Sequence, residues 1–302
     1  MTPRTPNPKG LIRSINALLK QEEALLSERL PYGLQTGLDL KLGLFRRKSG
    51  LYVPSKSAEP SILFESYEVL LIKAFQLLLT ACSKNSSSQI ISFTFRTIME
   101  IGLNRANAIF STHVSADEKT KIKLLSVLSD YAFMNSTWGK DWFIKLYDSE
   151  KKIFSAKEQS RIETMIGYPN ITRDGIYELR RFCASKISSA NDLVMKSVKS
   201  GAGVNQDSFK AIYGAYSHMM HGNVFQIETA LNPDNKARAK VHSRLFIISA
   251  GLNFAQRVAE HLADASLTTR IDTLTKQLVP VWNELWKDLV AARATKAKKS
   301  ST

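Results

Sequence analysis

Apolar residues recur at intervals of three and four along most of the chain, the spacing that places them on one face of a helix. The pattern begins with residues 11–30, lapses over residues 31–60 and returns almost without interruption from Ser61. It predicts helices over residues 62–82, 89–110, 115–134, 155–167, 176–200, 207–221, 232–265 and 269–294. No strand-rich block, sustained heptad or internal repeat accompanies them, so the expected fold is an all-helical (all-α) multi-helix bundle.

Local signals place several of the helix ends. Ser115 with Glu118, and Ser155 with Glu158, have the spacing of capping boxes, in which the serine hydroxyl accepts from an amide three residues on and the glutamate reaches back. Pro233 follows an asparagine and suits the first position of a helix. The proline inside the last predicted helix is expected to kink it.

Residues 44–53 interrupt the helical pattern and fit either a short hairpin around residues 48–50 or an arm without fixed structure. Basic residues here stand beside aromatic ones, and the set is Phe45, Arg46, Arg47, Lys48 and Tyr52. Arginine and lysine contact phosphates while aromatic rings stack on bases, which makes Arg46, Arg47 and Lys48 candidate nucleic-acid-binding residues. The alternative is a solvated loop.

The chain carries 42 Lys and Arg against 27 Asp and Glu, a formal net charge of +15. Residues 1–60 hold ten basic and five acidic residues, and residues 287–302 hold five and one. Such basic ends fit contact with nucleic acid or another polyanion, or else a solubilising surface. The predicted division is a basic N-terminal helix and arm (1–60), a helical bundle (61–295) and a disordered basic tail (296–302). The tail adds Lys296, Lys298 and Lys299 as nucleic-acid-binding candidates.

Two cysteines fall in the predicted helices, and a pair of tryptophans lies between the helices predicted for residues 115–134 and 155–167. Cys82 and Cys183 do not form a disulfide framework and are expected to be buried thiols in a reducing compartment. Trp138 and Trp142 are one helical turn apart and fit a core plug or a stacking platform. The most apolar stretch, residues 69–81, is too short to span a bilayer, and no secretory signal is visible. We therefore expect a cytoplasmic protein with no membrane contact.

A polar stripe of Arg96, Glu100 and Asn104 runs along the otherwise apolar helix predicted for residues 89–110. The apolar neighbours leave little of this helix for solvent, so Arg96 and Glu100 are expected to be partly buried, where an i, i+4 pair satisfies both charges. The stripe is then either a buried ion-pair network that fixes helix packing, or the wall of a cleft in which Arg96 binds a phosphate or carboxylate.

A second stripe lies on the helix predicted for residues 207–221, where Tyr213, Ser217 and His221 are spaced by four and His218 follows Ser217. His221 precedes a helix-stopping Gly-Asn pair, and the carbonyls there favour its protonated form. A single helix rarely aligns nucleophile, base and orienting group, and no acidic ligand stands beside the histidines. Serine-hydrolase chemistry, a metal site and a cofactor are therefore not expected. A histidine hydrogen-bonded in the core is the structural alternative.

Together the stripes resemble a family of uncharacterised bacterial all-helical proteins, through Arg96-Thr-x-x-Glu100, Asn104 and Tyr213-x-x-x-Ser217-x-x-x-His221-Gly222. That family is distantly similar to the HEPN group of helical nucleotide- and RNA-binding domains, many of which are metal-independent ribonucleases of toxin and phage-defence systems. The resemblance implies a catalytic set in which His221 is the general acid/base, Arg96 stabilises phosphorane charge, Glu100 holds Arg96, and Ser217 or Tyr213 orients the target. The HEPN spacing, an arginine followed after four to six residues by a histidine, is absent, since Arg238–His242 and Arg257–His261 are one residue short.

Three functions fit these observations. The first is an HEPN-like RNA- or nucleotide-binding protein, with or without metal-independent ribonuclease activity. The second is a non-enzymatic, nucleocapsid-like protein that binds nucleic acid through its basic arms. The third is a helical protein-interaction module. RNA is the favoured partner, and self-association or a protein partner is left open.

Overall fold

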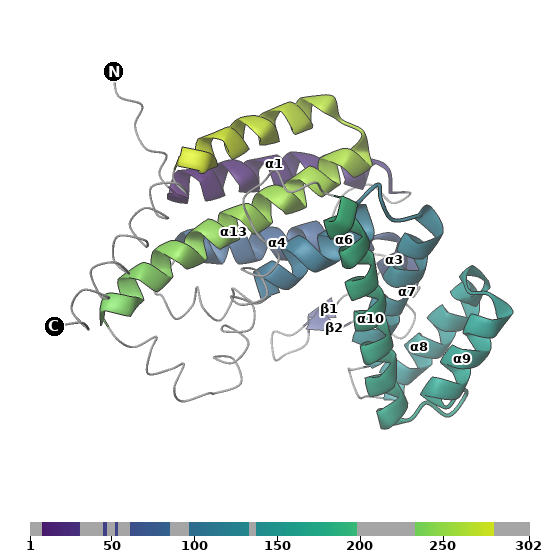
Figure 1. Ribbon diagram of the computed structural model, residues 1–302. Coiled ribbons are helices and arrows are strands. Elements are labelled where there is room, and N and C mark those ends of the chain that lie inside the picture. The colour runs from purple at the N-terminus through teal and green to yellow at the C-terminus, as the bar shows by residue number, and fades with distance from the viewer. Residues whose placement is uncertain are drawn as a thin grey trace, which may run out of the picture. The chain divides into compact units, whose positions relative to one another are not determined.

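The computed structural model describes residues 8–30, 45–46, 52–53, 61–84, 97–132, 137–197 and 233–280. These residues are almost wholly helical (Figure 1), which confirms the predicted all-helical fold. The exception is a hairpin in which strand β1 (Phe45–Arg46) pairs antiparallel with β2 (Tyr52–Val53). The hairpin interpretation of this segment is thereby confirmed over the unstructured arm. Within the described ranges, no helix has both the length and the apolar character needed to cross a membrane.

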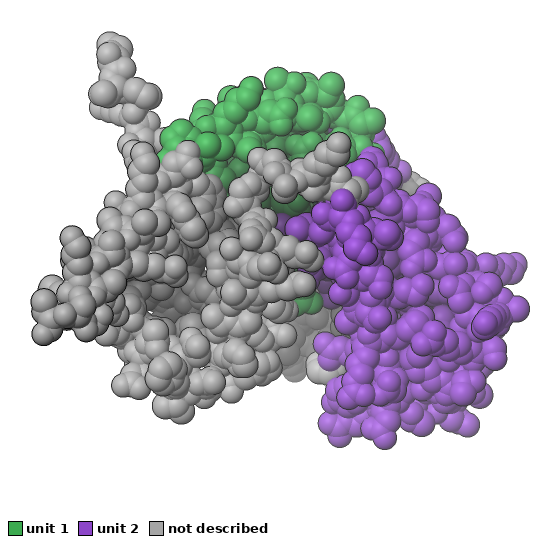
Figure 2. Space-filling model, in the orientation of Figure 1, with its two compact units in different colours: residues 1–19, 76–102, 204–302 green, residues 20–75, 103–203 purple. Residues whose placement is uncertain are grey.

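The chain divides into two compact units (Figure 2). Unit 1 comprises residues 1–19, 76–102 and 204–302, and unit 2 comprises residues 20–75 and 103–203. Both are therefore assembled from segments that are distant in the sequence. The division predicted from composition stays a prediction, because most of its basic arm and all of its tail lie outside the described residues.

Unit 1 is built from the first part of α1 (Pro8–Glu28), the last part of α4 (Tyr67–Lys84), α13 (Pro233–Leu262) and the helical residues 265–280. Helix α1 starts at Pro8, since a proline in the first turn forfeits no intrahelical hydrogen bond. Its apolar face is buried as the periodicity predicts, with Ile15 fully covered. Leu79 of α4 and Phe254 of α13 are covered to the same extent. This face-to-face burial of apolar stripes is what holds the unit together.

Unit 2 is organised around α7 (Ala116–Ala132), which contacts α3 (Ser61–Glu65), α6 (Ala106–Phe110), α8 (Thr137–Glu150) and α10 (Arg173–Ser197). A 3-10 turn, η2 (Lys151–Ile153), leads from α8 into α9 (Ala156–Ile166), which packs on α10. The core contains Leu128, Trp142, Phe143, Tyr147 and Leu179, all with 1% exposure or less. Trp142 is thus a core residue, which agrees with its interpretation as a core plug. The side chain of Trp138 lies outside the described part of the chain.

Two predicted helices are interrupted. The helix expected over residues 62–82 is two helices, α3 and α4, separated by a turn at the buried Ser66. The described part of the helix expected over residues 89–110 begins as an α-helix at 97, widens into the π-helix η1 (Glu100–Arg105) and returns to α-helical geometry in α6. The apolar spacing does not predict either break, because both segments keep apolar residues three and four positions apart.

The helix ends follow the local signals closely. Ser155 caps α9 with both bonds of a capping box, and α9 ends at Gly167 in the left-handed conformation (φ 72°). Helix α13 begins at Pro233, as predicted. At α7, the Ser115 hydroxyl accepts from the Glu118 amide at 3.3 Å, but the Glu118 carboxylate pairs with Lys186 of α10. Cys82 and Cys183 are free and buried, as expected.

Candidate functional site

The structure describes the side chains of two predicted site residues, Glu100 and Asn104, and the backbone of a third, Arg46. The remaining candidates lie outside the described residues and are Arg96, Ser217, His221, Arg47, Lys48, Tyr213, His218, Lys296, Lys298 and Lys299. The expected meeting of the two polar stripes therefore stays a prediction. The described part of the first stripe is its C-terminal half, with Glu100 and Asn104.

Glu100 and Asn104 both lie in the π-helix η1, and both are half-buried. A π-helix closes i→i+5 hydrogen bonds, so its wider turns place successive side chains differently from an α-helix. The uniform α-helical spacing assumed for the stripe is therefore wrong across residues 100–105. Short π segments are costly to retain and recur at functional sites. Both residues are therefore only partly shielded from solvent.

The next polar residues along this segment serve helix packing. The Arg105 guanidinium donates to the Tyr67 hydroxyl of α4 at 2.7 Å. Asn107 is buried, and its side-chain amide donates to the Asn191 oxygen of α10 at 2.6 Å. A buried amide without a partner costs free energy, so this bond fixes where α6 meets α10. Asn107 therefore serves the packing of α6 on α10.

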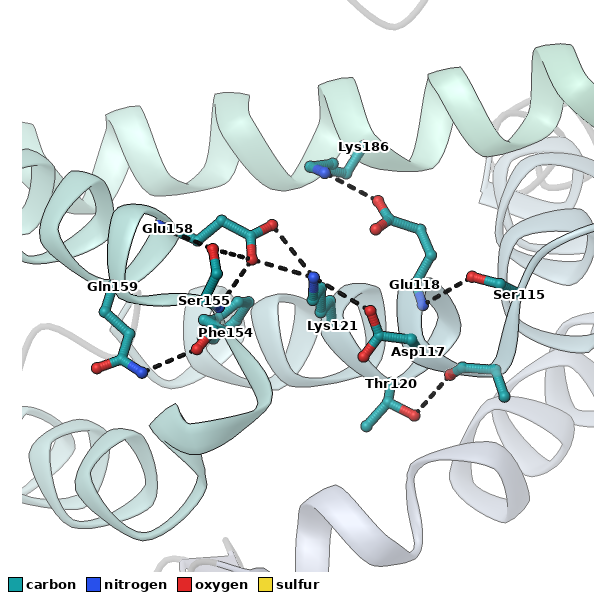
Figure 3. A network of polar contacts seen from close by, with 11 residues as sticks. Ser115, Asp117, Glu118, Thr120, Lys121, Phe154, Ser155, Glu158, Gln159 and Lys186 are labelled. Carbon is teal, nitrogen blue, oxygen red and sulfur yellow. Dashed lines mark hydrogen bonds and ion pairs between the residues drawn. The ribbon is translucent and has the colours of Figure 1, made fainter.

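A network of charged side chains joins α7, α9 and α10 (Figure 3). Lys121 of α7 pairs with Glu158 of α9 at 3.0 Å and with Asp117 at 3.2 Å, while Glu118 pairs with Lys186 of α10 at 2.9 Å. The hydrogen bond to Glu158 raises the pKa of Lys121. Every charge in this network has an opposite partner within the unit, which suits a scaffold that fixes three helices.

Glu158 is the residue of this network whose ionisation matters most. Burial would raise the pKa of Glu158, but the Ser155 amide and hydroxyl and the Lys121 ammonium outweigh it and lower the pKa from 4.5 to about 2. The carboxylate accepts from the Ser155 amide at 2.9 Å and from Lys121 at 3.0 Å. Because the folded-state pKa lies below the usual value, its contribution to stability is complete above pH 4.5 and is lost as the pH falls toward 2.

We expect Glu158→Gln to lower the free energy of unfolding by about 1 kcal/mol at pH 7, since it weakens a capping bond and an ion pair together. Denaturant titrations of both proteins between pH 7 and pH 2 measure the difference, which should shrink below about pH 4.5. The control is Glu178→Gln, which removes a carboxylate that is 52% exposed and paired with Arg181; it should cost less than about 0.5 kcal/mol. A difference for Glu158→Gln that stays constant with pH contradicts this assignment.

A second polar cluster, where α8 and η2 meet α9 and the loop after it, is also structural. Asp148 accepts from the Lys151 ammonium at 2.9 Å and from the Tyr168 hydroxyl at 3.1 Å. Burial, together with the neighbouring Glu163 carboxylate, raises the pKa of the fully covered Tyr147. The phenol therefore stays protonated at neutral pH and is unsuited to act as a base or nucleophile.

Arg257 of α13, which has a histidine four residues on, belongs to the packing as well. It is 8% exposed, and its guanidinium donates to the Glu260 carboxylate at 2.7 Å. Arg257 is therefore a buried residue of α13 and not part of its exposed surface. Its burial follows from the apolar face of α13, on which Arg257 stands beside Phe254 and Val258.

An exposed set of arginines and aromatic rings on α9 and α10 was not among the predicted site residues. Arg173 lies 5.8 Å from the ring centroid of Tyr177, and Arg161 of α9 lies 4.8 Å from that of Phe182. The sequence signal for part of this set is the four-residue spacing of Arg173, Tyr177 and Arg181. An amphipathic helix of 25 residues makes such a spacing easy to assign to an ordinary polar face.

Within the described residues, no group of three or more His, Cys, Asp or Glu side chains is placed to hold a metal ion. No family model, no curated protein and no solved structure matches the chain.

Proposed function

We propose that the protein binds RNA and that its basic ends make the main contacts with the phosphate backbone. The observation that carries this proposal is the charge distribution: a net charge of +15, with ten basic against five acidic residues in 1–60 and five against one in 287–302. Clustered lysine and arginine displace the counterions condensed on a nucleic acid, and this release drives sequence-independent binding.

RNA is favoured over DNA by the resemblance of the two polar stripes to helical RNA-binding families. In the finer form of the proposal, the stripes also cleave the bound strand without a metal. His221 then transfers protons and Arg96 stabilises the developing phosphorane charge, while Glu100 orients Arg96. The half-buried position of Glu100 in the described structure supports this form, because a fully covered carboxylate has no access to an RNA-bound arginine.

The binding proposal is tested by measuring the affinity for a labelled RNA over a range of salt concentrations. For the wild-type protein we expect the logarithm of the association constant to fall linearly with the logarithm of the salt concentration. Substituting Lys296, Lys298 and Lys299 together by Ala should weaken binding about tenfold near 0.1 M salt. The slope of log association constant against log salt concentration should also become less negative. For a single strand, the change is about 0.7 for each phosphate that the variant no longer neutralises.

A charge-matched control separates these lysines from a general loss of charge. Lys145, Lys152 and Lys276 are exposed, and replacing all three by Ala removes the same charge from other parts of the chain. It should leave the affinity nearly unchanged. Equal losses of affinity in both triple variants contradict the role of the tail, and a wild-type protein that binds no RNA at low salt overturns the proposal.

The proposed ribonuclease activity is tested separately from RNA binding. Wild-type protein and the His221→Ala variant are incubated with labelled RNA, with and without EDTA. We expect cleavage by the wild type that EDTA does not abolish and that the variant loses. Binding without cleavage under any condition supports the non-enzymatic, nucleocapsid-like alternative and removes the catalytic roles of His221 and Arg96.

A further inference from the structure

The exposed face of α10 presents an aromatic ring between arginines. Arg173, Tyr177 and Arg181 follow one another at four-residue intervals, so they share one face of the helix. Tyr177 is 39% exposed, and the Arg181 side chain is 76% exposed. By contrast, Trp142 and Tyr147 of the same unit have 1% exposure or less and belong to the core. Tyr177 is exposed beside cations, so its ring is open to contact with a ligand.

Two arginines of this region lie near aromatic rings. The Arg173 guanidinium lies 5.8 Å from the Tyr177 centroid, and one of its nitrogens is 3.5 Å from the Tyr177 hydroxyl. On the flank toward α9, the half-buried Phe182 ring has Arg161 at 4.8 Å and the Lys186 ammonium at 5.9 Å. A guanidinium has five N–H donors, so one that is held beside a ring still offers donors to a phosphate, which it binds in fork geometry.

The local charge is positive once internal pairs are set aside. Residues 157–181 contain five basic residues: Lys157, Arg161, Arg173, Arg180 and Arg181. Two of the four acidic residues in this stretch have partners on other helices, Glu158 with Lys121 of α7 and Glu163 with Tyr147 of α8. Asp174 and Glu178 remain on the exposed face, and Glu178 pairs with Arg181. Because Tyr147 is an uncharged partner, Glu163 keeps its negative charge, and the five exposed cations therefore face three acidic groups. This excess of positive charge favours an anionic ligand.

We infer that this face of α9 and α10 is a binding site for single-stranded RNA, in which a base stacks on Tyr177 while Arg173 and Arg181 hold the flanking phosphates. The inference rests on the proposed function and names a contact surface for it besides the basic ends. Residues 173–181 span about 12 Å at 1.5 Å per residue, the length of about three stacked nucleotides. Unpaired bases are required, because bases inside a duplex are stacked on one another and offer no face to an aromatic side chain.

The test uses the full-length protein and two labelled RNAs of equal length, one single-stranded and one duplex. We expect Tyr177→Ala to weaken single-strand binding by about fivefold or more, the usual range for loss of one base stack. The salt dependence should not change, because no charge is lost, and duplex binding should be unaffected. Tyr177→Phe should bind like the wild type, since it keeps the ring. Arg173→Ala with Arg181→Ala should weaken binding and also flatten the salt dependence.

The matched control is Leu193→Ala, at another exposed position of α10 (57%), which should bind like the wild type. Unchanged single-strand binding by Tyr177→Ala, or an equal loss for single strand and duplex, overturns the inference and leaves the proposed role of the basic ends intact. A wild-type protein that binds neither RNA fails the proposed function itself. If the Tyr177 and Arg173/Arg181 variants lose a co-purifying protein and bind RNA normally, the face is a protein interface, and the RNA assignment is wrong.

Discussion

Leu79→Ala is expected to lower the free energy of unfolding by about 2–5 kcal/mol, whereas Leu77→Ala should lower it by less than about 0.5 kcal/mol. The two leucines lie two positions apart on α4, in the same unit, yet Leu79 is fully covered and Leu77 is 72% exposed. The same atoms are deleted in both variants, with the same change in helix propensity. The difference between them therefore isolates the cost of opening a cavity in the core of unit 1 and of losing apolar burial there.

Chemical denaturation followed by circular dichroism measures both values against the wild type. Similar slopes of free energy against denaturant in the three proteins indicate that the change lies in stability and not in the compactness of the unfolded state. Equal losses of stability for the two variants would contradict the placement of Leu79 in the core and of Leu77 on the surface.

Apolar spacing was sufficient to predict most of the described helices, because each buries one apolar stripe, but it did not predict α8 (Thr137–Glu150). Ile15 of α1 and Ile162 of α9 are buried at positions where a helical face predicts burial. The start of α9 was equally predictable, since the Ser155 capping box is local and needs nothing from the rest of the chain.

Features that depend on distant residues were not predictable in this way. Glu118 has the sequence of a capping residue, but its carboxylate pairs with Lys186, 68 residues away. The π segment around Glu100 carries residues that an α-helix also accepts, so nothing in its spacing announces the wider turns. At Glu118, the contact with a residue of another helix prevails over the local capping preference.

Of the two candidate surfaces, one could be predicted from the sequence and the other could not. The polar stripe at Glu100 stands out because polar residues interrupt an apolar pattern, and half-burial of Glu100 agrees with that contrast. The Arg173–Tyr177–Arg181 face lacks such contrast, because charged residues are expected on the outer face of any amphipathic helix. Its distinguishing property is the exposure of the Tyr177 ring under a guanidinium, which only the folded arrangement reveals.

Gly175→Ala is expected to destabilise the protein by about 1–3 kcal/mol, although alanine is the better helix former. Gly175 lies in the first turn of α10, close against the end of α9. A Cβ at this position would stand 2.6 Å from the Ile166 Cα and 2.7 Å from the backbone oxygens of Ile166 and Met165. Backbone atoms cannot rotate out of the way as a side chain can. The two helices must therefore separate, which strains the loop in which the Thr172 amide donates to the Ile166 oxygen at 3.0 Å.

Gly251→Ala provides the comparison, because there the new Cβ would meet the Ile15 side chain at 3.1 Å and no backbone. A side chain can shift by a few tenths of an ångström, and the gain in helix propensity offsets part of the cost, so we expect a change of less than about 1 kcal/mol. Thermal and denaturant unfolding of both variants give the ranking. If Gly175→Ala is neutral or stabilising, α9 and α10 do not approach as closely as the structure places them. The contact of Arg161 with Phe182, on the flank of the Arg173–Tyr177–Arg181 face, would then lose its geometric basis, because it depends on the same approach.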